Sequence, residues 1–181
     1  MHRRKFLIGL GSAAIAVVAR PVLAAPSWSR DAKDPRWVQG QVVATSGADD
    51  VWSKLRNVSE WPHMFTDIKT MKILERSPDH WRLEMQTRTF DCGPHQYHVR
   101  FDEGRSGRMW IDAPGVSAIA YVRILPVVDR PEISRAVYSL FIDVRAPASW
   151  FISEADVRKK QEQMVTRYLA DLERLFAAPA A

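Results

Sequence analysis

The segment from Ser153 to Phe176 is the only long stretch of the sequence with a sustained helical period. An apolar stripe on one side opposes charged residues on the other, and this pattern predicts an amphipathic helix capped by Ser153. The stripe consists of Val157, Met164, Val165, Tyr168, Leu169, Leu172, Leu175 and Phe176, and the opposite side of Arg158, Lys159, Glu162, Arg167, Asp171 and Arg174. A helix of about 22 residues is about 33 Å long, so it could lie across a sheet of six or seven strands about 30 Å wide.

Most of the preceding chain alternates apolar and polar residues with a period of two, which is typical of strands with one buried face. Short turns rich in Gly, Pro and Asp separate these segments and favour an antiparallel meander, because parallel strands need long crossovers. The expected strands are residues 37–44, 68–75, 81–90, 97–102, 108–112, 118–128 and 134–145. The inward set is Trp81, Leu83, Met85, Tyr97, Val99, Phe101, Tyr138, Leu140 and Ile142. Pro126 indicates a bulge or an edge.

Two short helices are expected between the first and second of these strands. Ser46 and Asp49 form a weak capping pair for a helix that runs through Val58. Pro62 makes a continuation of that helix unfavourable, so residues 59–65 are expected to form a second short helix or turn. The predicted class is therefore α+β, with about seven strands in a curved antiparallel sheet around a long C-terminal helix.

Residues 1–24 have the pattern of an export signal, with a basic start, a moderately apolar run and a small-residue exit ending at Ala24. Arg3 and Arg4 resemble the twin-arginine signal, although His2 stands where a hydroxyl residue is usual. An ordinary secretory signal and an uncleaved anchor are the alternatives. The sequence thus predicts cleavage after Ala24 and a periplasmic or secreted protein, with a linker at residues 25–34, one domain at 35–178 and a disordered tail at 179–181.

The formal net charge of +5 comes largely from this leader. Residues 1–24 hold 4 of the 26 basic residues and no acidic one, so 22 basic and 21 acidic residues remain, a balance of +1. A nucleic-acid partner is therefore not expected. Cys92 is the single cysteine, so no intrachain disulfide can form and the fold must be stabilised by packing.

The order of strand, two short helices, six strands and a long final helix resembles the helix-grip fold of the START-like, polyketide cyclase/dehydrase (SRPBCC) superfamily. The local matches are residues 48–55, beginning Ala-Asp-Asp-Val-Trp, the Trp-Pro segment at residues 59–65 and the apolar stripe of the last helix. The resemblance covers about residues 35–177. It implies a pocket between sheet and helix, which in that superfamily holds lipids, sterols, polyketides or other apolar molecules, and it implies that a few members are enzymes.

Physical argument predicts the same pocket, because one helix about 10 Å across cannot fill a strongly curved sheet. Empty space is expected beside Met164 and Tyr168 on the helix. The expected ligand-binding residues are Met85, Tyr97, Val99, Tyr138, Met164 and Tyr168, with Trp61 and Phe65 at the mouth. The alternative is that these side chains fill the interior by packing against one another.

The sequence favours no cofactor and no metal site, since His95 and His98 point to opposite faces of one strand. An acid/base site could be formed by His95, Asp91 and Tyr138.

The predicted function is an exported carrier of a small hydrophobic molecule or lipid. The alternatives are a cyclase, dehydratase or isomerase acting without metal in the same pocket, and an accessory protein that acts through its outer surface. Expected partners are the apolar ligand and, through residues 1–24, the export machinery. The basic residues Arg158, Lys159 and Lys160 leave a transient membrane contact open.

Overall fold

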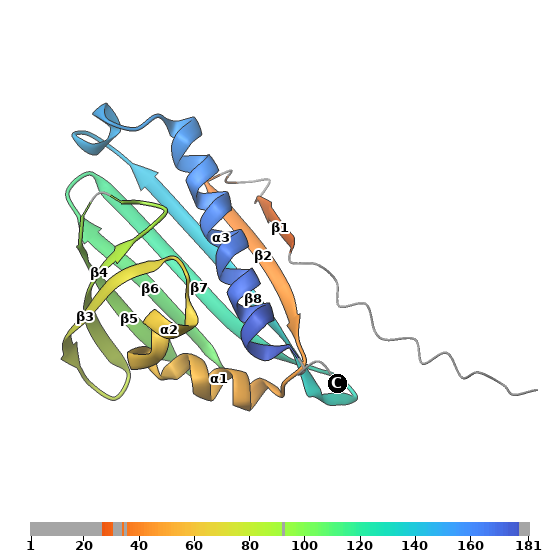
Figure 1. Cartoon of the computed structure of the whole chain (residues 1–181). Coiled ribbons are helices and arrows are strands. Elements are labelled where there is room, and N and C mark those ends of the chain that lie inside the picture. Colours follow the sequence, from red (N-terminus) through yellow and green to blue (C-terminus); the bar gives the residue numbers. More distant parts are fainter. Residues whose placement is uncertain (1–26, 31–33, 35, 92, 178–181) are drawn as a thin grey trace, which may run out of the picture.

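The computed structural model describes residues 27–30, 34, 36–91 and 93–177. Eight antiparallel strands form one curved sheet in the order β1-β2-β8-β7-β6-β5-β4-β3 (Figure 1). The strands are β1 Ser27–Arg30, β2 Trp37–Ala44, β3 Ile68–Arg76, β4 His80–Thr87, β5 His95–Asp102, β6 Ser106–Ala113, β7 Val116–Val127 and β8 Arg130–Val144. From β3 to β8 the sheet is an uninterrupted meander, and β2 closes onto β8, as the short turns predict.

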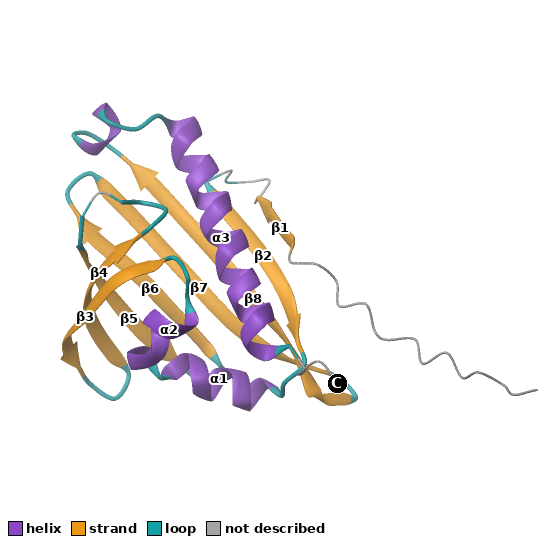
Figure 2. Ribbon diagram, viewed as in Figure 1, coloured by secondary structure: helices purple, strands orange, loops and turns teal. Residues whose placement is uncertain are grey.

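Apart from a short turn beyond the end of the last strand, the described helices lie on one face of this sheet (Figure 2). They are α1 Ala48–Arg56, the 3₁₀ turn η1 Val58–Glu60, α2 Trp61–Met64, the 3₁₀ turn η2 Ala148–Trp150 and α3 Glu154–Phe176. The predicted helix-grip architecture is confirmed. No helix in the described part of the chain is long and apolar enough to cross a membrane.

The sheet has one strand more than the sequence predicted. Strand β1 pairs with β2 and lies inside residues 25–34, the segment that was expected to be a linker. Four residues with no apolar alternation give no strand signal of their own, and β1 exists because the edge of β2 offers backbone partners. The predicted export signal at residues 1–24, the tail at 179–181 and Cys92 lie outside the described residues.

The expected Ser46 cap is wrong. Helix α1 begins after Gly47 and has no side-chain cap. The backbone oxygen of Ser46 instead accepts a hydrogen bond from Ser134 on β8, and Asp49 pairs with Arg105. The Ser153 cap is confirmed, because its hydroxyl accepts a hydrogen bond from the Asp156 amide at 3.1 Å. Pro126 lies at a register shift between β7 and β8, as its missing amide hydrogen predicts.

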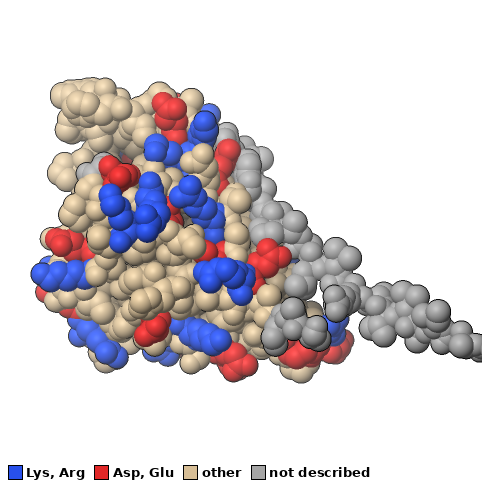
Figure 3. Space-filling model, in the orientation of Figure 1, with Lys and Arg blue, Asp and Glu red and all other residues tan. Residues whose placement is uncertain are grey.

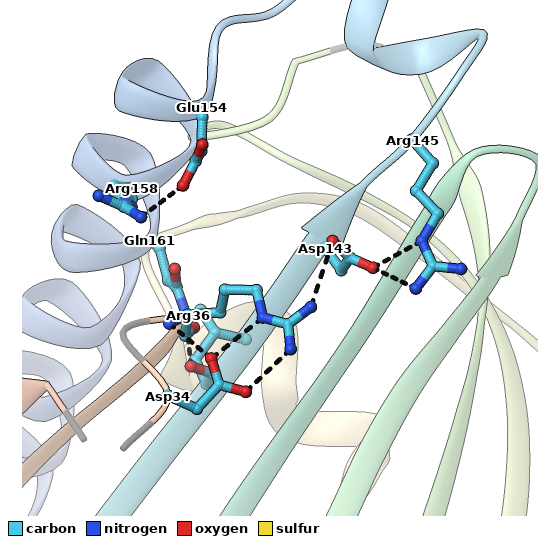
Figure 4. Close-up of polar contacts among 8 residues, drawn as sticks. Asp34, Arg36, Asp143, Arg145, Glu154, Arg158 and Gln161 are labelled. Carbon is cyan, nitrogen blue, oxygen red and sulfur yellow. Dashed lines mark hydrogen bonds and ion pairs between the residues drawn. The ribbon is translucent and has the colours of Figure 1, made fainter. Parts of the chain in front are cut away.

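Helix α3 does not lie across the whole sheet. It packs mainly on β2 and β8, and a buried glutamine fixes it there. The side-chain amide of Gln161 donates to the backbone oxygens of Arg36 and Leu140, one before β2 and one on β8 (Figure 4). Arg36 continues this contact through ion pairs with Asp34 and Asp143. The helix therefore covers one side of the curved sheet, and β5 and β6 lie away from it.

One residue of the predicted polar face of α3 is in fact buried. Asp171 is only 4% exposed, and its Oδ2 accepts hydrogen bonds from the Thr66 amide at 2.7 Å and the Thr66 hydroxyl at 2.9 Å. A buried carboxylate is tolerable when donors surround it, and Arg174 supplies a third donor. Asp171 thereby ties α3 to the segment after α2.

The apolar face of the sheet is buried as the alternation predicts. Leu83, Val99 and Leu140 on β4, β5 and β8 are all nearly inaccessible to solvent. The core has two parts: a larger cluster between α1, α3 and β2, β7 and β8, and a smaller one between η1 and strands β4 and β5. Between α3 and the middle strands the core is incomplete, and this incomplete region is the candidate site.

Candidate functional site

A cavity of about 580 Å³ lies between the sheet and the N-terminal half of α3. Its wall comes from the ends of several elements that meet at one end of the molecule: the start of β5, the β4–β5 and β6–β7 connections, the β8–α3 connection and α3 itself. We call this end the open end. Most of the lining is apolar and small or aliphatic, contributed by Ile111, Ala113, Pro114, Val116, Ala118, Leu140, Ile142, Val144, Ala148 and Ile152. Small side chains on a strongly curved sheet leave volume that one helix cannot fill.

A second, smaller cavity of about 80 Å³ lies deeper, toward α1 and α2. Four residues line both cavities, namely Met109, Ala120, Tyr138 and Met164. The two spaces are therefore neighbours, and Tyr138 and Met164 form part of the partition. The predicted empty space beside Met164 is present on both sides of it, whereas Tyr168 borders only the small cavity.

A stack of aromatic rings closes the interior toward α2, and we call this region the packed end. Tyr138 stacks on Tyr168 with ring centroids 4.0 Å apart, and Tyr168 stacks on Phe65 at 4.6 Å. Trp61 meets Phe65 edge to face at 6.0 Å, and its indole nitrogen donates to the Leu55 backbone oxygen. Such ring pairs contribute about 0.5–1.5 kcal/mol beyond area burial, so this end is held more firmly than packing area alone implies.

The two stacked tyrosines remain protonated at neutral pH. Burial raises the pKa of both hydroxyls, and the carboxylate of Asp67 raises the pKa of Tyr138 further. Each phenol therefore retains its O–H as a hydrogen-bond donor. Asp67 itself is held by the amide and hydroxyl of Thr89 and by Arg167, all on its Oδ1. Its Oδ2 is buried and has no hydrogen-bond partner among the described residues.

The three residues of the alternative acid/base site, Asp91, His95 and Tyr138, all line the large cavity. Asp91 already accepts hydrogen bonds from Lys69 at 3.0 Å and Gln86 at 2.6 Å. The Lys69 hydrogen bond lowers the pKa of the Asp91 carboxyl, which makes Asp91 a weak base. The raised pKa of Tyr138 makes that phenol a weak acid. The geometry brings the three residues together. However, the pKa values of Asp91 and Tyr138 are shifted away from the range that proton transfer near neutral pH requires.

The structure distributes the predicted ligand-binding residues over both cavities. Tyr97 borders the large cavity, and Tyr138 and Met164 border both. The remaining five border the small cavity only: Trp61, Phe65, Met85, Val99 and Tyr168. Trp61 and Phe65 thus lie away from the mouth of the large cavity, because α2 folds against β3 and α3 at the packed end. Their roles in ligand binding remain predictions.

Several lining residues were missed by the sequence analysis because they sit in connections without periodicity. Pro114 lies in the β6–β7 turn, and Ala148, Phe151 and Ile152 lie between β8 and α3. The apolar run from Trp150 to Ile152 directly before a helix cap is a usable signal for this wall. Asp171 was also missed, although it stands three residues after Tyr168 and seven after Met164, on the same side of the helix.

A metal site has little support from geometry. His95 borders the cavity, whereas His98 stacks on the outer face of the sheet with His80 and Trp110. Among the described residues, no group of three or more His, Cys, Asp or Glu side chains is close enough to hold a metal ion.

A scan against protein-family models and a search of curated protein sequences found no match. Solved structures do match. A protein from Thermus thermophilus superposes with a TM-score of 0.67 at 14% identity, covering 80% of this chain and 99% of the other. A START superfamily protein from Mycobacterium smegmatis gives a TM-score of 0.64 at 17% identity, with 77% and 96% covered. The Zhui aromatase/cyclase from a Streptomyces species gives 0.62 at 18%, with 80% and 98% covered.

The chain has the START-like, helix-grip fold. Identities of this size establish the architecture alone, because one fold supports many activities. In all three comparisons nearly the whole of the other chain is covered, so the resemblance extends over the complete fold of those proteins.

Proposed function

We propose that this protein binds a small hydrophobic molecule or lipid between its sheet and α3, and carries it. The observation on which this rests is the apolar cavity of about 580 Å³, which falls within the roughly 300–1,000 Å³ that is typical of ligand sites. Natural cores are packed to near-crystal density, so a space of this size is unfavourable unless something fills it.

The polar groups at the cavity suggest the form of the ligand. Most of the lining is apolar, while Asp91, His95 and Lys160 contribute polar groups, and the Asp91 side chain is 54% exposed to solvent. The ammonium of Lys160 donates to the Thr89 backbone oxygen and lies over the Phe90 ring. This arrangement suits a mostly apolar molecule with one polar group near the entrance. Structural neighbours named as START superfamily and aromatase/cyclase proteins are consistent with an apolar ligand.

Native mass spectrometry of protein purified from cells tests the proposal. We expect a co-purifying hydrophobic molecule in the unaltered protein and its loss in Ala118→Phe, because Ala118 faces the large cavity. The matched control is Ser117→Phe, one residue away on the exposed outer face of the same strand, which should retain the ligand. If the unaltered protein and both variants carry nothing even after incubation with total lipid extract, the carrier proposal is wrong.

A second candidate is a cyclase, dehydratase or isomerase that works without metal, favoured by the convergence of Asp91, His95 and Tyr138 on one cavity. Loss of turnover of a bound molecule in His95→Ala, with binding retained, would support this candidate over carriage alone. The pKa shifts of Asp91 and Tyr138 are the reason for ranking it second.

We also propose that the protein acts in the periplasm, reached by the twin-arginine route. The support is the sequence of residues 1–24 with its adjacent Arg3 and Arg4. The double variant Arg3→Lys with Arg4→Lys should accumulate in the cytoplasm of cells that depend on that route. Unchanged localisation of the double variant would rule the route out, and fractionation with a cytoplasmic marker provides the measurement.

A further inference from the structure

One carboxylate in the interior has a buried oxygen without a hydrogen-bond partner. Asp67 lies between α2 and β3 and lines the small cavity, and its side chain is only 14% exposed. Its Oδ1 accepts three hydrogen bonds, from the amide and hydroxyl of Thr89 and from Arg167. Its Oδ2 accepts none among the described residues. A buried acceptor without a donor is unfavourable, so this oxygen requires a donor from elsewhere.

The carboxylate is held in place from several sides. The three donors lie 3.0, 2.6 and 3.1 Å from Oδ1, which fixes the side chain. The backbone is fixed as well, because the Arg88 amide donates to the Asp67 carbonyl oxygen at 2.8 Å and the Arg88 side chain donates to that of Thr66 at 3.0 Å. Asp67 therefore cannot readily turn toward another donor, and a donor for Oδ2 has to reach it.

Asp171 provides a contrast within the same cavity. It also lines the small cavity, but both of its oxygens have donors. Its Oδ2 accepts from the amide and hydroxyl of Thr66, and its Oδ1 accepts from Arg174. The hydrogen-bonding capacity of Asp171 is thus used to hold α3, whereas Asp67 retains one oxygen for a further partner.

The other polar groups of the small cavity favour a hydroxyl group as that partner. Tyr138 and Tyr168 line the cavity, and burial raises the pKa of both, so each keeps its O–H donor. A ligand hydroxyl can accept a hydrogen bond from a phenol and donate one to a carboxylate oxygen. A ligand carboxylate, ketone or ether has no hydrogen to donate and would leave Oδ2 unpaired.

Positive charge is located at the surface and not in the small cavity. Arg108 is the one basic residue among the described residues that line this cavity, and it pairs with Asp102 on the outer face of the sheet. Figure 3 shows Lys and Arg side chains over α3 and the β4–β5 connection. Among them, Arg167 reaches Asp67 from the exposed side of α3, with 48% of its side chain in solvent. An anionic group would therefore find cationic partners outside, whereas the interior offers a neutral hydroxyl its two hydrogen bonds.

We propose that Asp67 determines ligand specificity, because its Oδ2 accepts a hydrogen bond from a hydroxyl group at the buried end of a hydrophobic ligand. The ligand class is hydrophobic alcohols. The apolar part occupies the large cavity, and the hydroxyl end passes the partition at Tyr138 and Met164, where the unbranched methionine side chain can adapt. This inference rests on the proposed binding function.

Two isomeric probes test the proposal. 1-Dodecanol and 1-methoxyundecane contain the same atoms and both accept a hydrogen bond, but only the alcohol donates one. Their dissociation constants are measured by calorimetry with the unaltered protein and with Asp67→Asn. In the variant, the donors from Thr89 and Arg167 should retain the amide oxygen, so that an N–H group replaces Oδ2. The ratio of the two constants should then shift by about tenfold against the alcohol, and probe solvation cancels in this comparison.

Arg167→Gln is the matched control. It removes the same ion pair but leaves Oδ2 as an acceptor, so the ratio of the two constants should equal that of the unaltered protein. Thermal unfolding verifies that both variants are folded. The same ratio in Asp67→Asn as in the unaltered protein would overturn the proposal. If neither probe binds the unaltered protein, the proposed binding function fails, which is a different result from equal ratios.

A second measurement needs no substitution, because nuclear Overhauser effects locate the hydroxyl end of bound 1-dodecanol in the unaltered protein. The methylene protons next to the hydroxyl should contact the rings of Phe65 and Tyr168, which border only the small cavity. Contacts of these protons with Ala148 and Ile152, which border only the large cavity, would overturn the proposal and would leave Oδ2 to a buried water.

Discussion

The two ends of the interior differ although the same sheet and the same helix enclose both. At the packed end, Phe65, Tyr138 and Tyr168 stack ring on ring, and Asp171 ties α3 to Thr66. At the open end, Ala113, Ala118 and Ala148 leave a space of about 580 Å³. The comparison teaches that one helix can act as core at its C-terminal half and as the wall of a cavity at its N-terminal half.

The largest expected contrast is between two substitutions on α3. Leu169 is fully buried at the packed end, so Leu169→Ala should lower the free energy of unfolding by about 3 kcal/mol. Met164 already borders both cavities, so Met164→Ala should cost only about 1 kcal/mol and should mainly weaken ligand binding. Urea denaturation of both variants measures the difference, and equal losses would contradict the division into two ends.

The two ends should also differ in how much a carboxylate contributes to stability, as Asp171 at the packed end and Asp91 at the open end can show. Asp171→Ala should destabilise the protein by about 2 kcal/mol, because the buried amide and hydroxyl of Thr66 lose their acceptor. Asp91 at the open end is paired with Lys69 in water, so Asp91→Ala should leave the free energy of unfolding nearly unchanged. Thermal unfolding monitored by circular dichroism compares them. A smaller loss in the first variant than in the second would show that Asp171 is not a structural tie.

Alkaline pH should weaken the aromatic stack. The pKa of Tyr138 and Tyr168 is raised in the folded state, so the folded protein keeps these protons while the unfolded chain loses them above a pH of about 10. The contribution of the two tyrosines to the free energy of unfolding is therefore fully present below that pH. Above it, the free energy of unfolding should fall by about 1.4 kcal/mol per pH unit for each tyrosine. Urea unfolding as a function of pH should show a flatter profile in Tyr138→Phe with Tyr168→Phe. Tyr121→Phe, on the outer face, is the control that should leave the slope unchanged.

The smallest effect is expected at the start of α3. Ser153→Ala removes the hydroxyl that accepts the Asp156 amide hydrogen and should cost about 1 kcal/mol. Ser153→Asp should restore most of the loss, since aspartate is an equally good cap at a helix N-terminus. Denaturant midpoints of the three proteins give the measurement. If the Asp variant is no more stable than the Ala variant, the cap does not account for the stability of the helix start.

Periodicity predicted the fold well, because a strand or helix with one buried face has apolar residues at the spacing of that face. The inward positions of β4, β5 and β8 followed from that pattern, and the cap at Ser153 followed from the preference of serine for the start of a helix. Strand β1 did not, because it exists through backbone pairing with β2 and needs no apolar residue. Asp171 was misplaced for a related reason: its burial depends on Thr66, a partner 105 residues away in sequence.

The existence of a cavity between sheet and helix could be predicted from the sequence, but its position could be predicted only in part. A curved sheet and one helix imply a space between them, and Met164 was correctly expected to border it. The position of that space depends on which side of the sheet the helix occupies, and this is decided by Gln161 and its two backbone acceptors. No periodicity marks a single buried glutamine as the residue that fixes a helix to one edge.

The Gln161 contact also bears on how the ligand range of such a protein could be redesigned. Because Gln161 fixes α3 through the backbone oxygens of Arg36 and Leu140, substitutions at Gln161 would disturb the seating of the helix before they changed the shape of the site. The opposite wall, the β4–β5 connection, meets α3 through the long side chains of Lys160 and Arg167 at Thr89. Libraries aimed at larger or smaller cargo should therefore vary that connection and keep Gln161 constant.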